Sequence, residues 1–172
     1  MKNKVALIIG AGDSLGSSIA RVFASDGFTV VVARRNGDKL SSLAEEIREN
    51  GGECFFYSLD ARKEDDVINL INKIENEIGE ILVAVYNIGA NIRYGILETT
   101  SRKYYKVWEM AAFGAFLMGR EVAKKMVPRK KGTIIFTGAS ASVRGKEGFA
   151  AFAGAKHCLL YTSDAADDTP CV

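Results

Sequence analysis

Short runs of apolar residues alternate along the chain with longer segments in which apolar residues recur every three or four positions. Runs of this length are typical of buried strands, and the longer spacing is typical of amphipathic helices. Five candidate strands lie at residues 5–9, 29–33, 54–57, 81–85 and 133–136. Because several of them are apolar at successive positions, we expect a parallel sheet with both faces buried.

The segments between these runs predict the helices. The first helix is expected to turn four side chains toward the core, namely Leu15, Ile19, Val22 and Phe23. Two further apolar stripes at helical spacing consist of Leu40, Leu43, Ala44 and Ile47, and of Val67, Leu70, Ile71, Ile74 and Ile78. Residues 102–127 predict one long helix that is closed by Pro128. Right-handed crossovers then give a doubly wound, Rossmann-type α/β fold with helices on both faces.

Composition and charge exclude several classes of function. The 172 residues suit one domain, and 48% hydrophobic with 26% charged residues is typical of a globular protein. A net charge of +2 predicts no nucleic-acid partner, and no apolar run is long enough to predict a membrane span. One histidine, His157, and three cysteines without a Cys-x-x-Cys pair predict no metal site. Because sparse cysteines suit a reducing compartment, we expect a cytoplasmic protein.

A glycine-rich segment directly follows the first candidate strand and precedes the first helix, at residues 10–16. Such a loop lets the backbone approach a pyrophosphate closely, and the start of the helix adds N–H groups and the positive end of its dipole. Leu15 stands where Gly-x-Gly-x-x-Gly requires its third glycine. Gly-x-x-x-Gly-x-Gly fits better, with Gly10 and Gly16 outermost, Ser14 in the middle position and Gly12 between. A plain tight turn remains the alternative.

The end of the second candidate strand carries two arginines, Arg34 and Arg35. In a dinucleotide site this position reads the adenosine ribose, with a carboxylate for a free 2′-hydroxyl or an arginine for a 2′-phosphate. No carboxylate follows until Asp38. Guanidinium groups suit a phosphate, so the sequence favours NADP (NADPH) over NAD. Two solvated arginines at the end of a strand remain the alternative.

Residues 3–157 resemble the short-chain dehydrogenase/reductase family. The resemblance rests on the loop at 10–16, on Arg34 and on three further motifs. These motifs are Asp60-Ala61, Asn87-Ile88-Gly89 and the segment 152–156. The resemblance implies that Asp60 contacts adenine and that the loop with Asn87 and Gly89 lies along the cofactor. It also implies an NADP(H)-dependent oxidoreductase that transfers a hydride to or from a carbonyl or alcohol substrate.

The catalytic positions depart from the family pattern. The family lysine, which holds the nicotinamide ribose and lowers the pKa of a tyrosine, corresponds to Lys156. The proton-donating tyrosine is replaced by Phe152, and the serine position falls on Ala139 with Ser140 directly after it. The asparagine that supports a proton relay is replaced by Ala111. Lys156 and Ser140 are therefore the candidate catalytic residues.

Three functions remain open from the sequence. The first is the NADP-dependent oxidoreductase with a small-molecule substrate, a homo-oligomer in its full-length form. The second is a catalytically silent NADP-binding protein, a cofactor sensor or oligomer subunit, which the replaced side chains favour. The third is an α/β nucleotide-binding domain that takes no dinucleotide. Tyr94 is either a further proton donor or a packing residue.

The last fifteen residues differ in character from the rest. Residues 158–168 resemble the translation of a transposase adapter used in sequencing-library preparation. We therefore expect residues 1–157 to be a truncated dinucleotide-binding domain and residues 158–172 to be a non-native tail. The sheet is then incomplete at its C-terminal edge. A divergent native terminus is the alternative.

Overall fold

The computed structural model describes residues 3–167, and the contacts among them form two compact units. The first unit contains Met1–Asn87 and Leu117–Ile135, and the second contains Ile88–Phe116 and Phe136–Val172. Each unit takes two separate stretches of the sequence, so neither is a continuous sequence domain.

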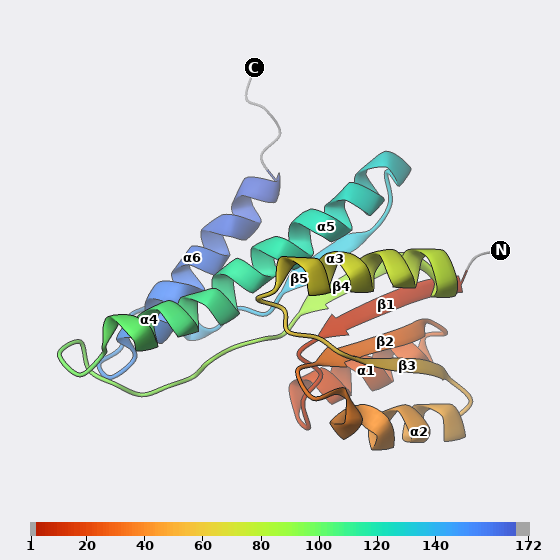
Figure 1. Cartoon of the computed structure of the whole chain (residues 1–172), viewed down its shortest axis with the longest axis horizontal. Helices are drawn as coiled ribbons and strands as arrows, with labels where there is room; N and C mark the ends of the chain where they lie inside the picture. Colours follow the sequence, from red (N-terminus) through yellow and green to blue (C-terminus); the bar gives the residue numbers. More distant parts are fainter. Residues whose placement is uncertain (1–2, 168–172) are drawn as a thin grey trace. The chain divides into compact units, whose positions relative to one another are not determined.

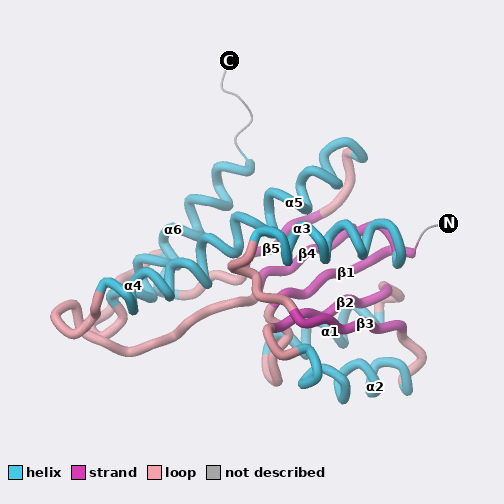
Figure 2. Tube along the Cα trace, in the orientation of Figure 1, coloured by secondary structure: helices cyan, strands magenta, loops and turns pink. Residues whose placement is uncertain are grey.

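A parallel sheet forms the centre of the first unit (Figures 1 and 2). Its strands are β1 (Asn3–Ile9), β2 (Thr29–Arg34), β3 (Glu53–Ser58), β4 (Gly79–Tyr86) and β5 (Thr133–Phe136), in the order β3-β2-β1-β4-β5. β1 pairs in parallel with both β2 and β4 and places Ile9 opposite Ala33 and Tyr86. The strand order reverses at β1, so the doubly wound α/β fold predicted from the sequence is confirmed. β5 lies at one edge, with Ile135 42% exposed.

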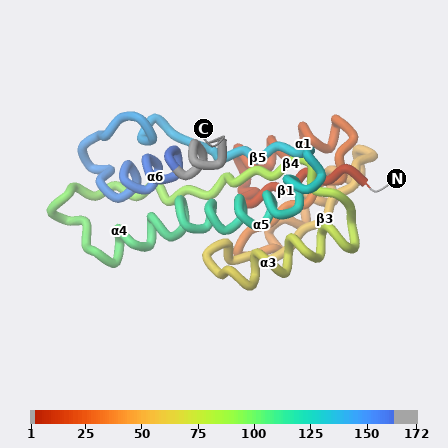
Figure 3. The backbone as a smooth tube through the Cα atoms, turned by 90° about the horizontal axis from the view of Figure 1, so that it is seen from above, coloured from red at the N-terminus to blue at the C-terminus, as the bar shows by residue number. Residues whose placement is uncertain are grey.

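Helices cover both faces of this sheet. α1 (Leu15–Ser25) and α2 (Ser41–Glu49) lie on one face, and α3 (Glu64–Lys73) lies on the other (Figure 3). A 3-10 turn, η1 (Gly37–Leu40), leads into α2, and a π turn, η2 (Ile74–Ile78), follows α3. One core cluster unites strand and helix residues that are at most 7% exposed, among them Ala6, Ile8, Val30, Val32, Ala20, Leu43, Ala44 and Ile47.

The prediction for the first helix is wrong at two positions. Leu15 is 51% exposed and Val22 is 59% exposed, whereas the buried positions of α1 are Gly16, Ser17 and Ala20. Small side chains let a helix backbone approach a sheet closely, so the buried stripe of α1 is built from them. Larger apolar residues contribute only from its margin.

The single long helix predicted for residues 102–127 is also wrong. This segment divides into α4 (Ser101–Trp108), a π turn η3 (Glu109–Phe113) and α5 (Gly114–Arg129). A π turn inserts an extra residue into the helical repeat, which hydrophobic spacing alone does not indicate. Pro128 lies inside the last turn of α5, and the helix ends one residue beyond it.

The second unit is built mainly from α4, η3, a 3-10 turn η4 (Ser140–Ser142) and α6 (Ala150–Asp167). Val107 and Ala111 pack against Ala151 and Ala155 of α6. α6 continues past His157, and residues 168–172 lie outside the described part of the chain. The non-native tail at 158–172 stays a prediction.

Neither a membrane-crossing helix nor a cluster of metal-ligating side chains occurs within the described residues. No helix within residues 3–167 is long and apolar enough to cross a membrane. In the same part of the chain, no three side chains of His, Cys, Asp or Glu lie close enough to share a metal ion.

Candidate functional site

The turn between β1 and α1 is shaped by its glycines. Gly10 has a φ of 91°, in the left-handed region that favours glycine. A Cβ added to Gly16 would lie 2.5 Å from the carbonyl oxygen of Gly10, so α1 begins in direct contact with the turn. A Cβ added to Gly12 would meet nothing within 4 Å. Gly10 and Gly16 thus make the turn tight, while the space beside Gly12 is open.

Two neighbouring strands hold this turn in place. The backbone N–H of Gly10 donates to the carbonyl oxygen of Ala33, at the end of β2, over 2.8 Å. Asn87, which follows β4, donates from Nδ2 to the carbonyl oxygen of Gly10 over 3.2 Å and from its backbone N–H to that of Ile9 over 2.8 Å. The turn therefore lies where the strand order reverses, which is where ligands bind in open α/β sheets.

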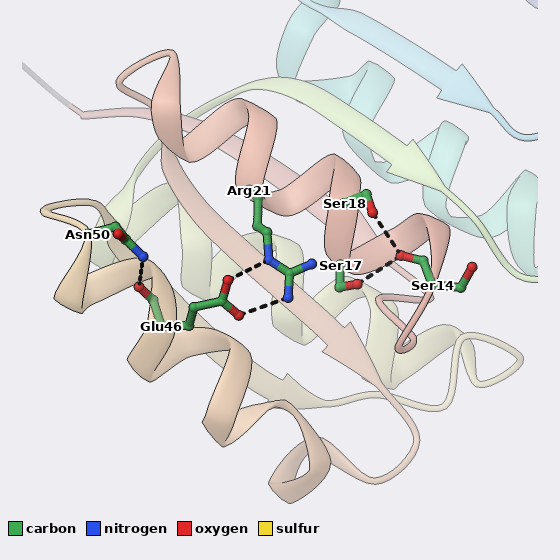
Figure 4. A network of polar contacts seen from close by, with 6 residues as sticks. All are labelled: Ser14, Ser17, Ser18, Arg21, Glu46 and Asn50. Atoms are coloured by element: carbon green, nitrogen blue, oxygen red, sulfur yellow. Dashed lines mark hydrogen bonds and ion pairs between the residues drawn. The ribbon is translucent and has the colours of Figure 1, made fainter.

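The start of α1 has no side-chain cap. Ser14 occupies the N-cap, but its side chain accepts no capping hydrogen bond. The hydroxyls of Ser17 and Ser18 donate instead to the carbonyl oxygen of Ser14, over 2.8 and 3.3 Å (Figure 4). Further along α1, Arg21 forms a two-pronged ion pair with Glu46 of α2. In the first turn of α1, the backbone N–H of Ser17 donates to the carbonyl oxygen of Gly12 over 3.0 Å, and no side-chain cap occupies the N–H groups of Leu15 and Gly16.

The predicted arginines lie at the end of β2. Arg34 is half-buried, and Arg35 is exposed. Arg34 Nη1 lies 3.3 Å from Oδ1 of Asp13, whose side chain is 94% exposed. A carboxylate from the glycine turn therefore faces the position at which a 2′-phosphate is predicted. Sequence reasoning missed Asp13, although its acidity within a phosphate-type loop was a visible signal.

Asp60 follows β3 and is bound by a nearby arginine. Both oxygens of its carboxylate accept hydrogen bonds from Arg62, over 2.8 Å from Nε and 2.6 Å from Nη2. These bonds hold the pKa of Asp60 below its ordinary value, against the opposing effect of burial. Asp60 is therefore ionised at neutral pH and oriented by Arg62, a partner that sequence reasoning did not identify. Ala61 is buried.

In the second unit, Lys156 on α6 has a buried amine. The side chain is 3% exposed, and Nζ donates to the carbonyl oxygens of Thr137 over 2.7 Å and Ile88 over 3.4 Å. Burial lowers the pKa of this ammonium group. Two neutral carbonyls thus fix the position of a cation that has lost most of its hydration.

Phe152 lies one turn before Lys156 and lines the same space beside Gly89. A Cβ added to Gly89 would lie 3.8 Å from Cε2 of Phe152 and 4.0 Å from Nζ of Lys156. The aromatic ring and the amine are therefore neighbours, as a four-residue spacing on a helix requires. The ring has no proton to donate, so Lys156 is the titratable group at this position.

The two serines of η4 differ in accessibility. Ser142 is buried, and its hydroxyl oxygen accepts a hydrogen bond from the backbone N–H of Ala139 over 3.1 Å. Ser140 is exposed. Ser142 thus acts within its own turn, whereas Ser140 is accessible to solvent. Ala111 is buried in η3 and provides no polar group for a proton relay.

Tyr94 belongs to a different contact within the second unit. The ammonium group of Lys103 lies 3.5 Å from the centre of the Tyr94 ring, and the backbone N–H of Tyr94 donates to Gly148. This cation–π contact favours the packing interpretation of Tyr94.

The predicted site residues therefore fall into two sets. The first unit holds Gly10, Gly12, Ser14, Leu15, Gly16, Arg34, Arg35, Asp60, Ala61 and Asn87, and the second holds Gly89, Ser140 and Lys156. The parallel sheet with a glycine turn at its switch point defines a Rossmann-like α/β fold.

Comparison with known proteins identifies the family. The model of the family described as short chain dehydrogenase matches residues 4–169. A 2-dehydro-3-deoxy-D-gluconate 5-dehydrogenase of Formosa agariphila is 31% identical over 157 residues, which are 91% of this chain and 60% of that protein. A 2,3-dihydro-2,3-dihydroxybenzoate dehydrogenase of Bacillus subtilis is 27% identical over 157 residues, again 91% of this chain and 60% of that protein. The chain thus spans about 60% of the length of these curated relatives.

Solved structures of short-chain dehydrogenases and related oxidoreductases are also similar to this chain. The crystal structure of a short-chain dehydrogenase from Rhodopseudomonas palustris is similar with a TM-score of 0.92 and 47% identity, over 96% of this chain and 77% of that one. Actinorhodin polyketide ketoreductase with NADPH gives a TM-score of 0.90 and 26% identity over 96% and 66% of the two chains. An NAD+-bound xylitol dehydrogenase gives a TM-score of 0.91 and 25% identity, over 96% of this chain and 64% of that one. The chain belongs to the short-chain dehydrogenase/reductase family.

Two substitutions in the glycine turn are expected to differ in their effect on stability. Gly16→Ala places a methyl group against the backbone of Gly10 and Ala11, so we expect the free energy of unfolding to fall by about 1–3 kcal/mol. The methyl group of Gly12→Ala enters open space, so we expect the free energy of unfolding to change by less than about 0.5 kcal/mol. Urea unfolding of both variants measures the difference, and equal losses would contradict the packing described for Gly16.

Lys156→Met is expected to show a pH-dependent effect on stability. Because burial lowers the pKa of Lys156 from its ordinary 10.5, the unfolded chain binds this proton more tightly than the folded chain. The stability of the wild type therefore gains from rising pH between the lowered pKa and 10.5, and methionine has no such dependence. Urea unfolding should show the variant's stability relative to wild type decreasing toward pH 10.5. A constant difference would contradict a desolvated ammonium group.

Proposed function

We propose that this chain binds NADP(H) and belongs to an NADP(H)-dependent oxidoreductase that transfers a hydride to or from a small carbonyl or alcohol substrate. The observation that carries the proposal is the anchored glycine turn beside the end of β2. Two arginines stand at that strand end, and β2 itself contributes no carboxylate there. Membership of the family supports the reaction class. Among the similar structures, one contains NADPH and another NAD+, so the NADP preference rests on Arg34 and Arg35.

The residues of the first unit have distinct proposed roles toward the cofactor. The turn from Gly10 to Gly16, with Gly12, Ser14 and Leu15, receives the pyrophosphate at the start of α1. Arg34 and Arg35 receive the 2′-phosphate. Asp60 and Ala61 lie along the adenine, and Asn87 keeps the turn attached to β4.

The second unit supplies the candidates for proton transfer. When bound, the cofactor would supply or accept the hydride. Lys156 and Gly89 are proposed to lie at the nicotinamide ribose. Lys156 or Ser140 donates the proton to the substrate oxygen through a water molecule, because Phe152 has none to give. The desolvated amine of Lys156 favours proton release, since burial lowers its pKa.

A second candidate function is a catalytically silent NADP-binding protein. Phe152, Ala139 and Ala111 support it because each replaces a polar family side chain with an apolar one. The loss of a positioned general acid lowers a rate by about 10²–10⁴. Slow hydride transfer to an activated carbonyl therefore remains physically possible, and turnover by the wild type separates the two functions.

A homo-oligomeric full-length form and a cytoplasmic location stay predictions. The first rests on the family resemblance. The second rests on the sparse cysteines. The size of the full-length protein in solution tests the first, and imaging of a tagged full-length protein in cells tests the second.

Restoring the missing hydroxyl is expected to reveal the site. The wild type should enhance NADPH fluorescence on binding, and Phe152→Tyr should raise carbonyl-dependent NADPH oxidation by about 10²–10⁴ because it returns a general acid beside Lys156. Phe152→Leu is the control, which changes the ring without adding a proton donor. If the wild type does not bind NADPH, both proposed functions are overturned. A wild type that binds NADPH but turns over no carbonyl, together with an active Phe152→Tyr, would favour the silent protein.

A further inference from the structure

Asp13 places a negative charge inside a turn that is proposed to receive a highly charged anion. Its side chain is 94% exposed, and nothing packs it into the protein core. Its carboxylate lies 3.3 Å from the guanidinium of Arg34, whose side chain is only 27% exposed. The arginine that is predicted to bind a 2′-phosphate therefore already has an anionic partner.

Three other charged residues, Arg21, Lys39 and Glu46, line the cavity beside Asp13. A cavity of about 210 Å³ beside the turn is lined by Gly12, Asp13, Arg21, Lys39 and Glu46, among others. Arg21 is paired with both oxygens of Glu46, so these two charges largely offset each other. Arg34 is the cation in hydrogen-bonding contact with Asp13.

We propose that Asp13 competes with the 2′-phosphate for Arg34 and so limits the preference of this chain for NADPH over NADH. This inference rests on the proposed function. A carboxylate repels both cofactors through their shared pyrophosphate, but only NADPH must also displace it from Arg34. Removal of the Asp13 charge should therefore strengthen NADPH binding more than NADH binding.

Asp13→Asn tests this competition directly, because asparagine keeps the shape of the side chain and removes its charge. Binding of NADPH and of NADH to the full chain is measured by fluorescence titration at low and high salt. We expect the variant to bind NADPH about three- to tenfold more tightly and NADH less than about twofold more tightly, as suits one exposed charge pair. High salt should shrink the gain, because it screens exposed charges.

Two further variants control for other causes. Asp26→Asn removes an exposed carboxylate at the opposite end of α1 and should leave both affinities unchanged. In an Arg34→Gln background, Asp13→Asn should no longer shift the ratio of the NADPH and NADH affinities, because the two residues act on one interaction.

The outcomes separate this inference from the proposed function. If the wild type binds NADPH and Asp13→Asn leaves the ratio of affinities unchanged, the competition is overturned while NADPH binding stands. An equal shift with and without Arg34 would also overturn it. If neither cofactor binds the wild type, the proposed function fails and this inference fails with it.

Discussion

The hydrogen bonds around Gly10 join the ends of three adjacent strands, and the candidate cofactor site depends on them. The N–H of Gly10 is tied to Ala33 of β2, and its carbonyl oxygen is tied to Asn87 after β4. Gly16 then packs α1 directly against the same turn. A side chain at Gly16 would push the helix away. Loss of the Asn87 amide would break the tie between this carbonyl and β4, and the carbonyl would keep its hydrogen bond from the N–H of Gly12. The position of the first-turn N–H groups is thus determined by contacts with the backbone of the sheet.

Binding and chemistry are supported unequally by the two sets of residues. In the first unit, hydrogen bonds join the glycine turn to Ala33 of β2 and to Asn87, and Arg34 ends the same strand β2; these residues carry the proposed binding of phosphates. In the second unit, Lys156 keeps a buried and oriented amine, but its neighbour Phe152 is an apolar ring. Buried lysines are destabilising unless their hydrogen bonds are satisfied, and here two backbone carbonyls accept hydrogen bonds from Nζ. The proposed role of Lys156 in cofactor binding therefore does not depend on whether the chain catalyses a reaction.

Much of the fold followed from the sequence because the buried strands are continuous apolar runs. All five strands lie where these runs predicted them, with ends that differ by at most two residues. The π turns after α3 and inside the 101–129 region were not predictable, since one inserted residue leaves the apolar spacing nearly intact. Leu15 was misplaced because a helix that packs through Gly16 buries small residues in preference to large ones.

The candidate site could be predicted only in part, for a related reason. A sequence motif predicts which residue type stands at the end of a strand, and Arg34 and Asp60 were predicted in this way. Their charge partners, Asp13 and Arg62, depend on side-chain geometry across or beyond the motif. Such pairs affect how freely a ligand can use a charged residue, so the proposed competition by Asp13 would modify the cofactor preference that Arg34 and Arg35 indicate.

Hydrogen–deuterium exchange with and without NADPH tests whether the glycine turn binds the cofactor, because it reports on the backbone N–H groups of the turn. We expect NADPH to slow exchange in peptides that cover residues 10–18 and the end of β2, and to leave peptides from the C-terminal half of α2 unaffected. Unchanged exchange in the glycine turn at saturating NADPH, or protection confined to other segments, would contradict it.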